Sequence, residues 1–92
     1  MTHKLYVIFD AASDSVIGGV HAFPHDAVAV RMFGEIASNP QTDVCKYPKD
    51  FSLRCVGVID LSTGVIIPRR DIDTVMSAEL FKAVSAGVEV ES

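Results

Sequence analysis

The feature that most constrains the fold is a run of strict alternation between residues 51 and 60. Apolar or small residues stand at every second position of this run, and polar or β-branched ones stand between them. Because successive side chains of a strand point to opposite faces of a sheet, a period of two predicts a β-strand. The face expected to pack against a helix carries Phe51, Leu53, Cys55, Gly57 and Ile59.

The residues that follow predict the second half of a hairpin. Asp60 to Gly64 indicates a turn, with glycine where a positive φ angle is needed. Val65 to Ile67 predicts the returning strand, and Pro68 is expected to stop it because proline has no backbone N–H to donate. Arg69 and Arg70 then fall at a strand end.

A second hairpin is expected at the start of the chain. Lys4 to Asp10 is rich in β-branched and aromatic residues, Ala11 to Asp14 has turn composition, and Ser15 to Phe23 predicts an antiparallel partner strand. A glycine pair, Gly18 and Gly19, interrupts the second strand. It indicates either a bend or bulge within the hairpin, or a backbone surface open to a partner.

A helix is expected between the two hairpins. Residues 24–26 predict its start, and apolar residues then recur at helical spacing as far as Ser38. Asn39 tolerates the left-handed conformation that ends a helix, and Pro40 cannot continue it.

The tail predicts a second helix. Ser77 is expected to cap a helix from Ala78 to Ala86 that stops at Gly87, and Val88 to Ser92 to fray or add an edge strand. Together the elements predict one α+β domain over residues 1–92, a small antiparallel sheet with ββαββ order and a C-terminal helix. A chain of 92 residues buries a modest core, so we expect a homodimer to supplement it.

Composition narrows the expected environment. No apolar run reaches the roughly 18 residues of a transmembrane helix, and the N-terminus lacks the pattern of a signal peptide. Cys45 and Cys55 are then expected to be free thiols in a reducing cytosol. We therefore expect a cytoplasmic protein with no membrane contact.

The stretch from Asn39 to Phe51 shows neither helical nor strand periodicity. It contains two of the four prolines, two lysines and a tyrosine. A structureless connection of this length in a small domain is usually functional or disordered, so this stretch is the first candidate for a binding surface. Pro48 is expected to hold Tyr47 on extended backbone.

Residues for catalysis or metal binding are sparse. The histidines and cysteines lack the spacings of metal sites, and Gly18-Gly19 lacks the rest of a phosphate-binding motif. Cysteine catalysis needs a base near the thiol, whereas Cys55 alternates with core residues as a buried small hydrophobe does. We therefore expect no enzyme, no catalytic residue, no metal and no cofactor.

The charge is unevenly distributed along the chain. Its net value is −4, but residues 44–70 hold five cations and two acids, a net +3, between ends of −3 (residues 1–43) and −4 (residues 71–92). Such a stretch is either an ordinary solvated surface or a platform where cations contact phosphates and rings stack on bases. The candidate DNA-binding residues are Lys46, Tyr47, Lys49, Arg54, Arg69 and Arg70.

Several motifs carry a family resemblance. The run K-Y-P-x-D-F-x-L begins at Lys46 and is followed by G-x-x-D and T-G. With these motifs the chain resembles the small nonstructural protein of gokushoviruses, single-stranded DNA phages of the microvirus group. The resemblance covers residues 4–67 and leaves 68–92 as a variable tail. The matching positions are Tyr6, Asp10, Phe23, Arg31, Phe33, Asn39, Pro40, Tyr47, Pro48, Asp50, Phe51, Leu53, Gly57, Asp60 and Gly64.

The resemblance implies a function but no catalytic residues. Members of that family are described as candidate DNA-binding proteins, so we expect binding of single-stranded DNA during genome synthesis or packaging in the bacterial host cytoplasm. The alternative is an adaptor that recruits the phage replication protein or a capsid protein through the apolar tail helix or an open sheet edge.

Overall fold

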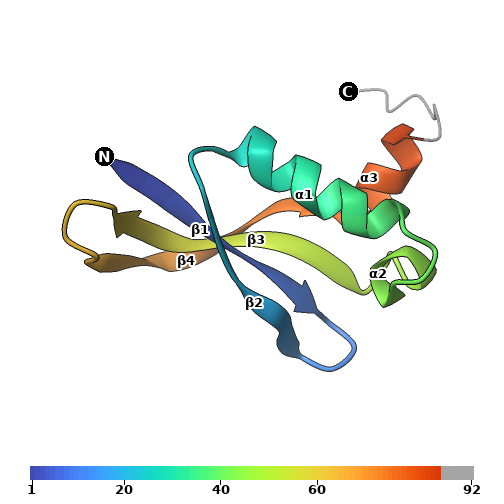
Figure 1. The fold of residues 1–92 in the computed structure, drawn as a ribbon. Helices are drawn as coiled ribbons and strands as arrows, with labels where there is room; N and C mark the ends of the chain where they lie inside the picture. Colours follow the sequence, from blue (N-terminus) through green and yellow to red (C-terminus); the bar gives the residue numbers. More distant parts are fainter. Residues whose placement is uncertain (86–92) are drawn as a thin grey trace.

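The computed structural model describes residues 1–85, which form one four-stranded antiparallel sheet and three helices (Figure 1). The strands lie in the order β2-β1-β3-β4. This confirms the predicted α+β fold with ββαββ order and a C-terminal helix. The elements are β1 (Thr2–Asp10), β2 (Ser15–Phe23), α1 (Asp26–Ser38), α2 (Asp43–Lys46), β3 (Phe51–Asp60), β4 (Ile66–Ser77) and α3 (Ala78–Ser85).

The core lies between one face of the sheet and the helices. Figure 1 shows α1 and α3 on the same side of the sheet, here called the helix face, and the other side is called the open face. Tyr6 and Leu53 reach the core from the central strands, Phe33 reaches it from α1, and Val44 reaches it from α2; all four are fully buried. Burying side chains of this size contributes on the order of 1.5–3 kcal/mol each.

Strand β1 presents different sets of side chains to the two faces. Tyr6 and Ile8 belong to the core with α1, whereas Leu5 and Val7 are also buried but lie on the open face. Because β1 is a central strand, side chains of both neighbouring strands flank Leu5 and Val7.

The alternation predicted for residues 51–60 holds only as far as Cys55. Phe51, Leu53 and Cys55 are core residues, as expected. The pairing of β1 with β3 then shifts by one residue, which brings Gly57 opposite Leu5 and so onto the open face. The expectation that Gly57 and Ile59 face the helix is therefore wrong, because one extra residue in a strand exchanges the faces of all that follow.

Strand β4 corrects another prediction. It does not stop at Pro68 but continues to Ser77, so Arg69 and Arg70 lie within it. Pro68 pairs with Gly57 and Asp73 pairs with Cys55, which leaves residues 69–72 opposite a single β3 residue. Proline is tolerated here because β4 is an edge strand and its pairing is interrupted at this point.

The stretch from Asn39 to Phe51 is more ordered than its sequence predicts. It contains the short helix α2, capped by Thr42, whose side chain accepts a hydrogen bond from the backbone N–H of Cys45 at 3.2 Å. Asn39 follows α1 in an extended rather than left-handed conformation. The stretch lacks periodicity because one turn of helix is too short to show any.

The glycines of the two hairpins and the cap of α3 match the expectations. Gly64 has a φ angle of +79° in the β3–β4 turn, and Gly18 has one of +69° where the pairing of β1 with β2 shifts. Ser77 accepts a hydrogen bond from the backbone N–H of Leu80 and caps α3. The predicted helix stop at Gly87 and the segment 88–92 lie outside the described residues.

Candidate nucleic-acid interface

The predicted binding stretch forms a hollow at one end of the sheet. Its lining residues come from the turn between α2 and β3, and its volume is about 360 Å³. We call it the end hollow, and it is lined by Lys46, Tyr47, Pro48, Lys49 and Asp50. The Tyr47 side chain is 58% exposed, so an apolar ring is available beside two ammonium groups.

Local hydrogen bonds fix the backbone of the end hollow. The N–H of Tyr47 donates to the carbonyl of Asp43 at 2.8 Å, and the N–H of Asp50 donates to the carbonyl of Tyr47 at 3.0 Å. Tyr47 itself has φ −127° and ψ 61°, outside the α region as Pro48 requires, but not in the extended conformation that was expected. The tyrosine is thus presented on a constrained turn.

Two longer connections anchor this turn to the rest of the fold. Ala11, in the β1–β2 turn, donates its N–H to the carbonyl of Asp50 at 2.8 Å. Lys82 of α3 donates from Nζ to the carbonyl of Cys45 at 2.8 Å, and its Nζ lies 3.4 Å from the Cys45 sulfur. The end hollow is therefore held from both sides by elements distant in sequence.

The ion pairs among the described residues lie elsewhere. Within residues 1–85, Lys4 pairs with Asp26 and Arg69 pairs with Asp73. No ion pair in that part of the chain involves Lys46 or Lys49. Asp50, in the same hollow, directly follows Lys49, and Asp43 lies three residues before Lys46. The local positive charge predicted for this stretch is thus reduced by Asp50 but not cancelled by ion pairs.

Arg54 lies on the open face rather than in the end hollow. It pairs with Val7 across the sheet, and its guanidinium carbon stands 4.0 Å from the centre of the Phe9 ring. Its Nε donates to the Ser52 hydroxyl at 3.2 Å. Asp10 pairs with Phe51, so this cation–π pair occupies the same end of the sheet as the end hollow.

Phe9 was missed by sequence reasoning. It alternates with Leu5 and Val7 along β1, so it lies with them on the open face. The sequence contains no signal that Phe9 contacts Arg54, because this contact depends on the register of β1 against β3.

Arg69 and Arg70 do not join the other candidates. Arg69 lies along the middle of β4, where its guanidinium pairs with Asp73 and its Nε donates to the carbonyl of Asp71 at 3.3 Å. Arg70 is exposed on the adjacent edge of the sheet. The structure therefore brings Lys46, Tyr47 and Lys49 together, places Arg54 at the same end of the sheet, and separates the other two arginines.

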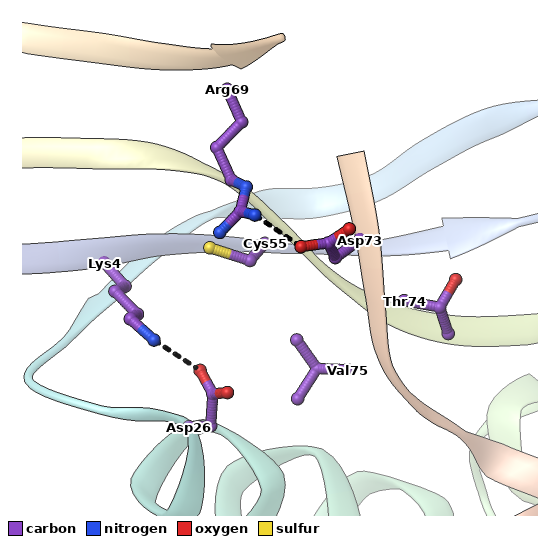
Figure 2. Close-up of a pocket in the computed structure, with 7 residues that line it drawn as sticks. All are labelled: Lys4, Asp26, Cys55, Arg69, Asp73, Thr74 and Val75. Atoms are coloured by element: carbon purple, nitrogen blue, oxygen red, sulfur yellow. Dashed lines mark hydrogen bonds and ion pairs between the residues drawn. The ribbon is translucent and has the colours of Figure 1, made fainter. Parts of the chain in front are cut away.

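A second hollow lies on the helix face, and sequence reasoning did not find it. Its volume is about 390 Å³, and Figure 2 shows the residues that line it, which come from α1, β1, β3 and β4. We call it the central hollow, and it is lined by Lys4, Asp26, Cys55, Arg69, Asp73, Thr74 and Val75.

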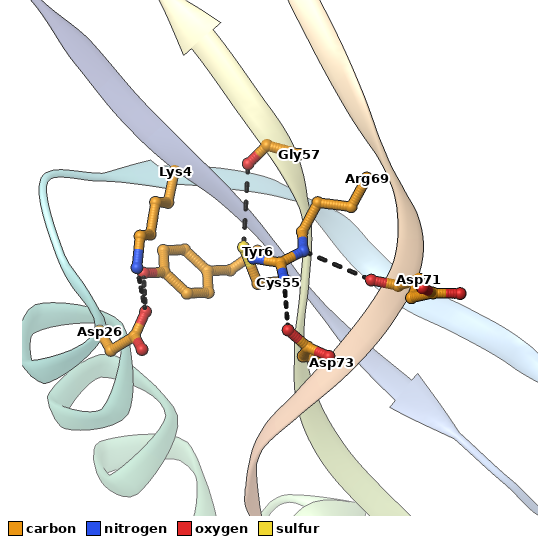
Figure 3. A network of polar contacts seen from close by, with 8 residues as sticks. All are labelled: Lys4, Tyr6, Asp26, Cys55, Gly57, Arg69, Asp71 and Asp73. Carbon is orange, nitrogen blue, oxygen red and sulfur yellow. Dashed lines mark hydrogen bonds and ion pairs between the residues drawn. The ribbon is translucent and has the colours of Figure 1, made fainter.

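A polar network supports the wall of the central hollow. Figure 3 shows Lys4 and Tyr6 both meeting Oδ1 of Asp26: the Tyr6 hydroxyl donates to it at 2.5 Å and Lys4 Nζ lies 3.4 Å from it. The hydrogen bond from Tyr6, with Lys4 and Arg69 nearby, lowers the pKa of Asp26. Burial, with the Asp26 carboxylate as hydrogen-bond acceptor, raises the pKa of Tyr6. Asp26 is thus held as an acceptor.

These features define a small α+β protein whose described residues form one antiparallel sheet, with the central hollow on its helix face and the end hollow at one end of it. The central hollow lies beside the first residue of α1, and the end hollow lies beyond the other end of that helix. The chain belongs to the Phage ORF5 protein family, whose model matches residues 3–81, and it is therefore a phage protein.

No curated protein and no solved structure matched the chain. The family match runs through the whole sheet and into α3. Among residues 1–85, no helix is both long and apolar enough to cross a membrane.

Proposed function

We propose that this phage protein binds single-stranded DNA, without catalysing a reaction, during genome synthesis or packaging of a gokushovirus-type phage in the host cytoplasm. The observation that carries the proposal is the end hollow, where Lys46 and Lys49 flank the exposed ring of Tyr47. The ammonium groups would contact phosphates, and the ring would stack on a base.

The physical requirements of single-strand binding support this assignment. Such proteins combine cations that follow the phosphate backbone with aromatic rings, and each stacked base contributes about 1–3 kcal/mol. The Phe9–Arg54 pair on the open face extends the same combination along the sheet. Within about 8–10 Å, local charge outweighs the net charge of the molecule, so an acidic protein can still present a cationic site.

A charge-reversal experiment tests the proposal. In the Lys46→Glu/Lys49→Glu variant, affinity for a labelled single-stranded oligonucleotide should fall roughly tenfold or more. The slope of log affinity against log salt should flatten by about 1.4, because each lost phosphate contact contributes about 0.7 on a single strand. Fluorescence anisotropy at several salt concentrations measures both quantities.

The matched control uses single reversals. Arg31 is exposed on α1, away from the lining of either hollow. Arg31→Glu changes the net charge as much as Lys49→Glu does, yet it should leave affinity nearly unchanged. Equal losses in these two variants would show that only the overall charge matters, and the end hollow would then not be the binding site.

The adaptor function is supported by a different observation. Leu61, Val65, Ile66 and Ile67 are exposed on the β3–β4 hairpin, which forms an arm extending away from the helices (Figure 1). Edge strands and apolar arms of this kind pair with other proteins. A tagged protein used to capture partners from infected host lysate, with and without nuclease, separates the two functions. A replication or capsid protein retained after nuclease treatment would support the adaptor.

A further inference from the structure

The central hollow owes its shape to an irregularity in β4. Residues 69–72 lie opposite the single residue Val56, so this part of the strand leaves the regular ladder. Gly57 permits the close approach just before it, because a β-carbon there would lie 2.6 Å from the carbonyl oxygen of Ile67. Irregularities of this kind re-aim side chains and are frequent beside binding sites.

Arg69 is the first residue of this segment. It points from β4 toward the hollow, where Asp73 of the same strand pairs with it (Figure 2). The other wall carries Lys4 from β1 and Asp26 from the first turn of α1. Two cations and two carboxylates thus surround one space of about 390 Å³.

This charge pattern selects the chemistry of a ligand. Phosphate and other anions are disfavoured by the two carboxylates, and simple cations are disfavoured by Lys4 and Arg69. The fitting ligand is uncharged and presents hydrogen-bond donors and acceptors side by side. The existing ion pairs do not prevent entry, since Lys4, Asp26, Arg69 and Asp73 are all partly exposed and such pairs contribute only about 0–1 kcal/mol.

We propose that the central hollow seats one guanine base of the bound strand. Guanine carries two neighbouring acceptors, O6 and N7, which Arg and Lys side chains recognise. Its N1–H and exocyclic N2 amino group are neighbouring donors, which carboxylates accept. Arg69 on one wall therefore matches the acceptors and Asp26 on the other wall matches the donors, while Asp73 and Lys4 orient these two groups through the ion pairs. Of the four DNA bases, guanine alone offers two adjacent donors together with two adjacent acceptors.

The inference rests on the proposed function but occupies a separate site. Helix α1 has 13 residues, so about 20 Å of helix separates the central hollow from the end of α1 that leads to the end hollow. Substitutions in one hollow therefore leave the lining of the other unchanged.

The probes are the four deoxynucleosides, which lack phosphate and so do not engage the lysines of the end hollow. They are titrated into the full-length protein labelled with ¹⁵N, and amide chemical shifts are followed. Deoxyguanosine should give saturable shifts at Asp26, Cys55 and Asp73, with at least tenfold tighter binding than the other three. Arg69→Gln and Asp73→Asn should each weaken deoxyguanosine at least tenfold.

Two controls keep the outcomes distinct. Asp71→Asn alters the same strand outside the lining and should leave deoxyguanosine binding unchanged, as should Lys46→Glu/Lys49→Glu. Shifts of equal size for all four nucleosides, or full binding by Arg69→Gln, would overturn the inference. Failure of the oligonucleotide experiment with intact deoxyguanosine binding would instead refute the end hollow alone.

Discussion

At the scale of single residues, Asp26 connects the most parts of the structure through its contacts. One of its oxygens meets both the buried Tyr6 hydroxyl and the Lys4 ammonium group, so a single carboxylate joins the core to the surface. The same residue occupies the first turn of α1, where a negative charge also favours the unpaired N–H groups of the helix. Its ionisation therefore matters for stability as well as for the central hollow.

Asp26 should make the protein sensitive to acid. Its folded-state pKa lies below the ordinary value of 3.8, so its contribution to stability is present above about pH 3.8 and is lost as the pH falls through the lowered value. Asp26→Asn should therefore lose less stability than the parent between pH 7 and pH 3, as measured by urea midpoints. Asp71→Asn serves as the exposed control, and an unchanged pH dependence in Asp26→Asn would contradict the assignment.

At the scale of elements, the short helix α2 depends on its cap. The Thr42 hydroxyl caps the Cys45 N–H and also lies 2.7 Å from the carbonyl of Ile36 and 2.8 Å from that of Asn39. Thr42→Ala should lower the free energy of unfolding by about 1 kcal/mol, the usual value of such a cap. It should also weaken oligonucleotide binding, because α2 leads directly into the end hollow.

The conservative variant Thr42→Ser retains a hydroxyl and should restore both properties. Urea unfolding and anisotropy measure them separately. If Thr42→Ala loses no stability, the capping hydrogen bond has no energetic role.

The close approach of β3 and β4 at Gly57 is possible because glycine has no side chain. Gly57→Ala would push a β-carbon against the backbone at Ile67, which has no flexible end to move aside. We expect a loss of about 1–3 kcal/mol in the free energy of unfolding, as is usual for overpacking. Gly19→Ala meets nothing within 4 Å and should change stability by less than about 0.5 kcal/mol. Similar values for the two variants would show that β4 can shift freely.

These elements show what a sequence can reveal. The strands, α1 and the start of α3 follow from periodicity and caps, because each signal is local. The face change after Cys55 and the excursion of β4 depend on strand register, which is set by pairing across the sheet. The end hollow was found because its residues are contiguous. The central hollow was not, since Lys4, Asp26 and Arg69 meet only in the folded chain.

At the scale of the whole molecule, the arm formed by the β3–β4 hairpin exposes neighbouring apolar side chains in a single chain. Ile66 and Ile67 are 56% and 62% exposed on a free edge strand. We propose that two copies pair through this arm, since an edge strand can pair with its own copy across a twofold axis.

Ile66→Thr/Ile67→Thr keeps β-branched side chains but removes apolar surface. It should weaken dimerisation at least tenfold, measured by light scattering over a dilution series. Val20→Thr, at an exposed position on the opposite edge strand β2, should have no effect. A parent protein that stays monomeric at the highest concentration would exclude the arm as a dimer interface.

Helix α1 fixes the separation between the central hollow and the end hollow. Its first residue lines one of them, and the chain that leaves its last residue builds the other. If DNA occupies both hollows as proposed, this fixed length sets how many nucleotides separate a base seated at one end from a base stacked at the other. A strand that satisfies both ends must therefore carry its guanine at a fixed spacing, so the length of one helix would become a rule about DNA sequence.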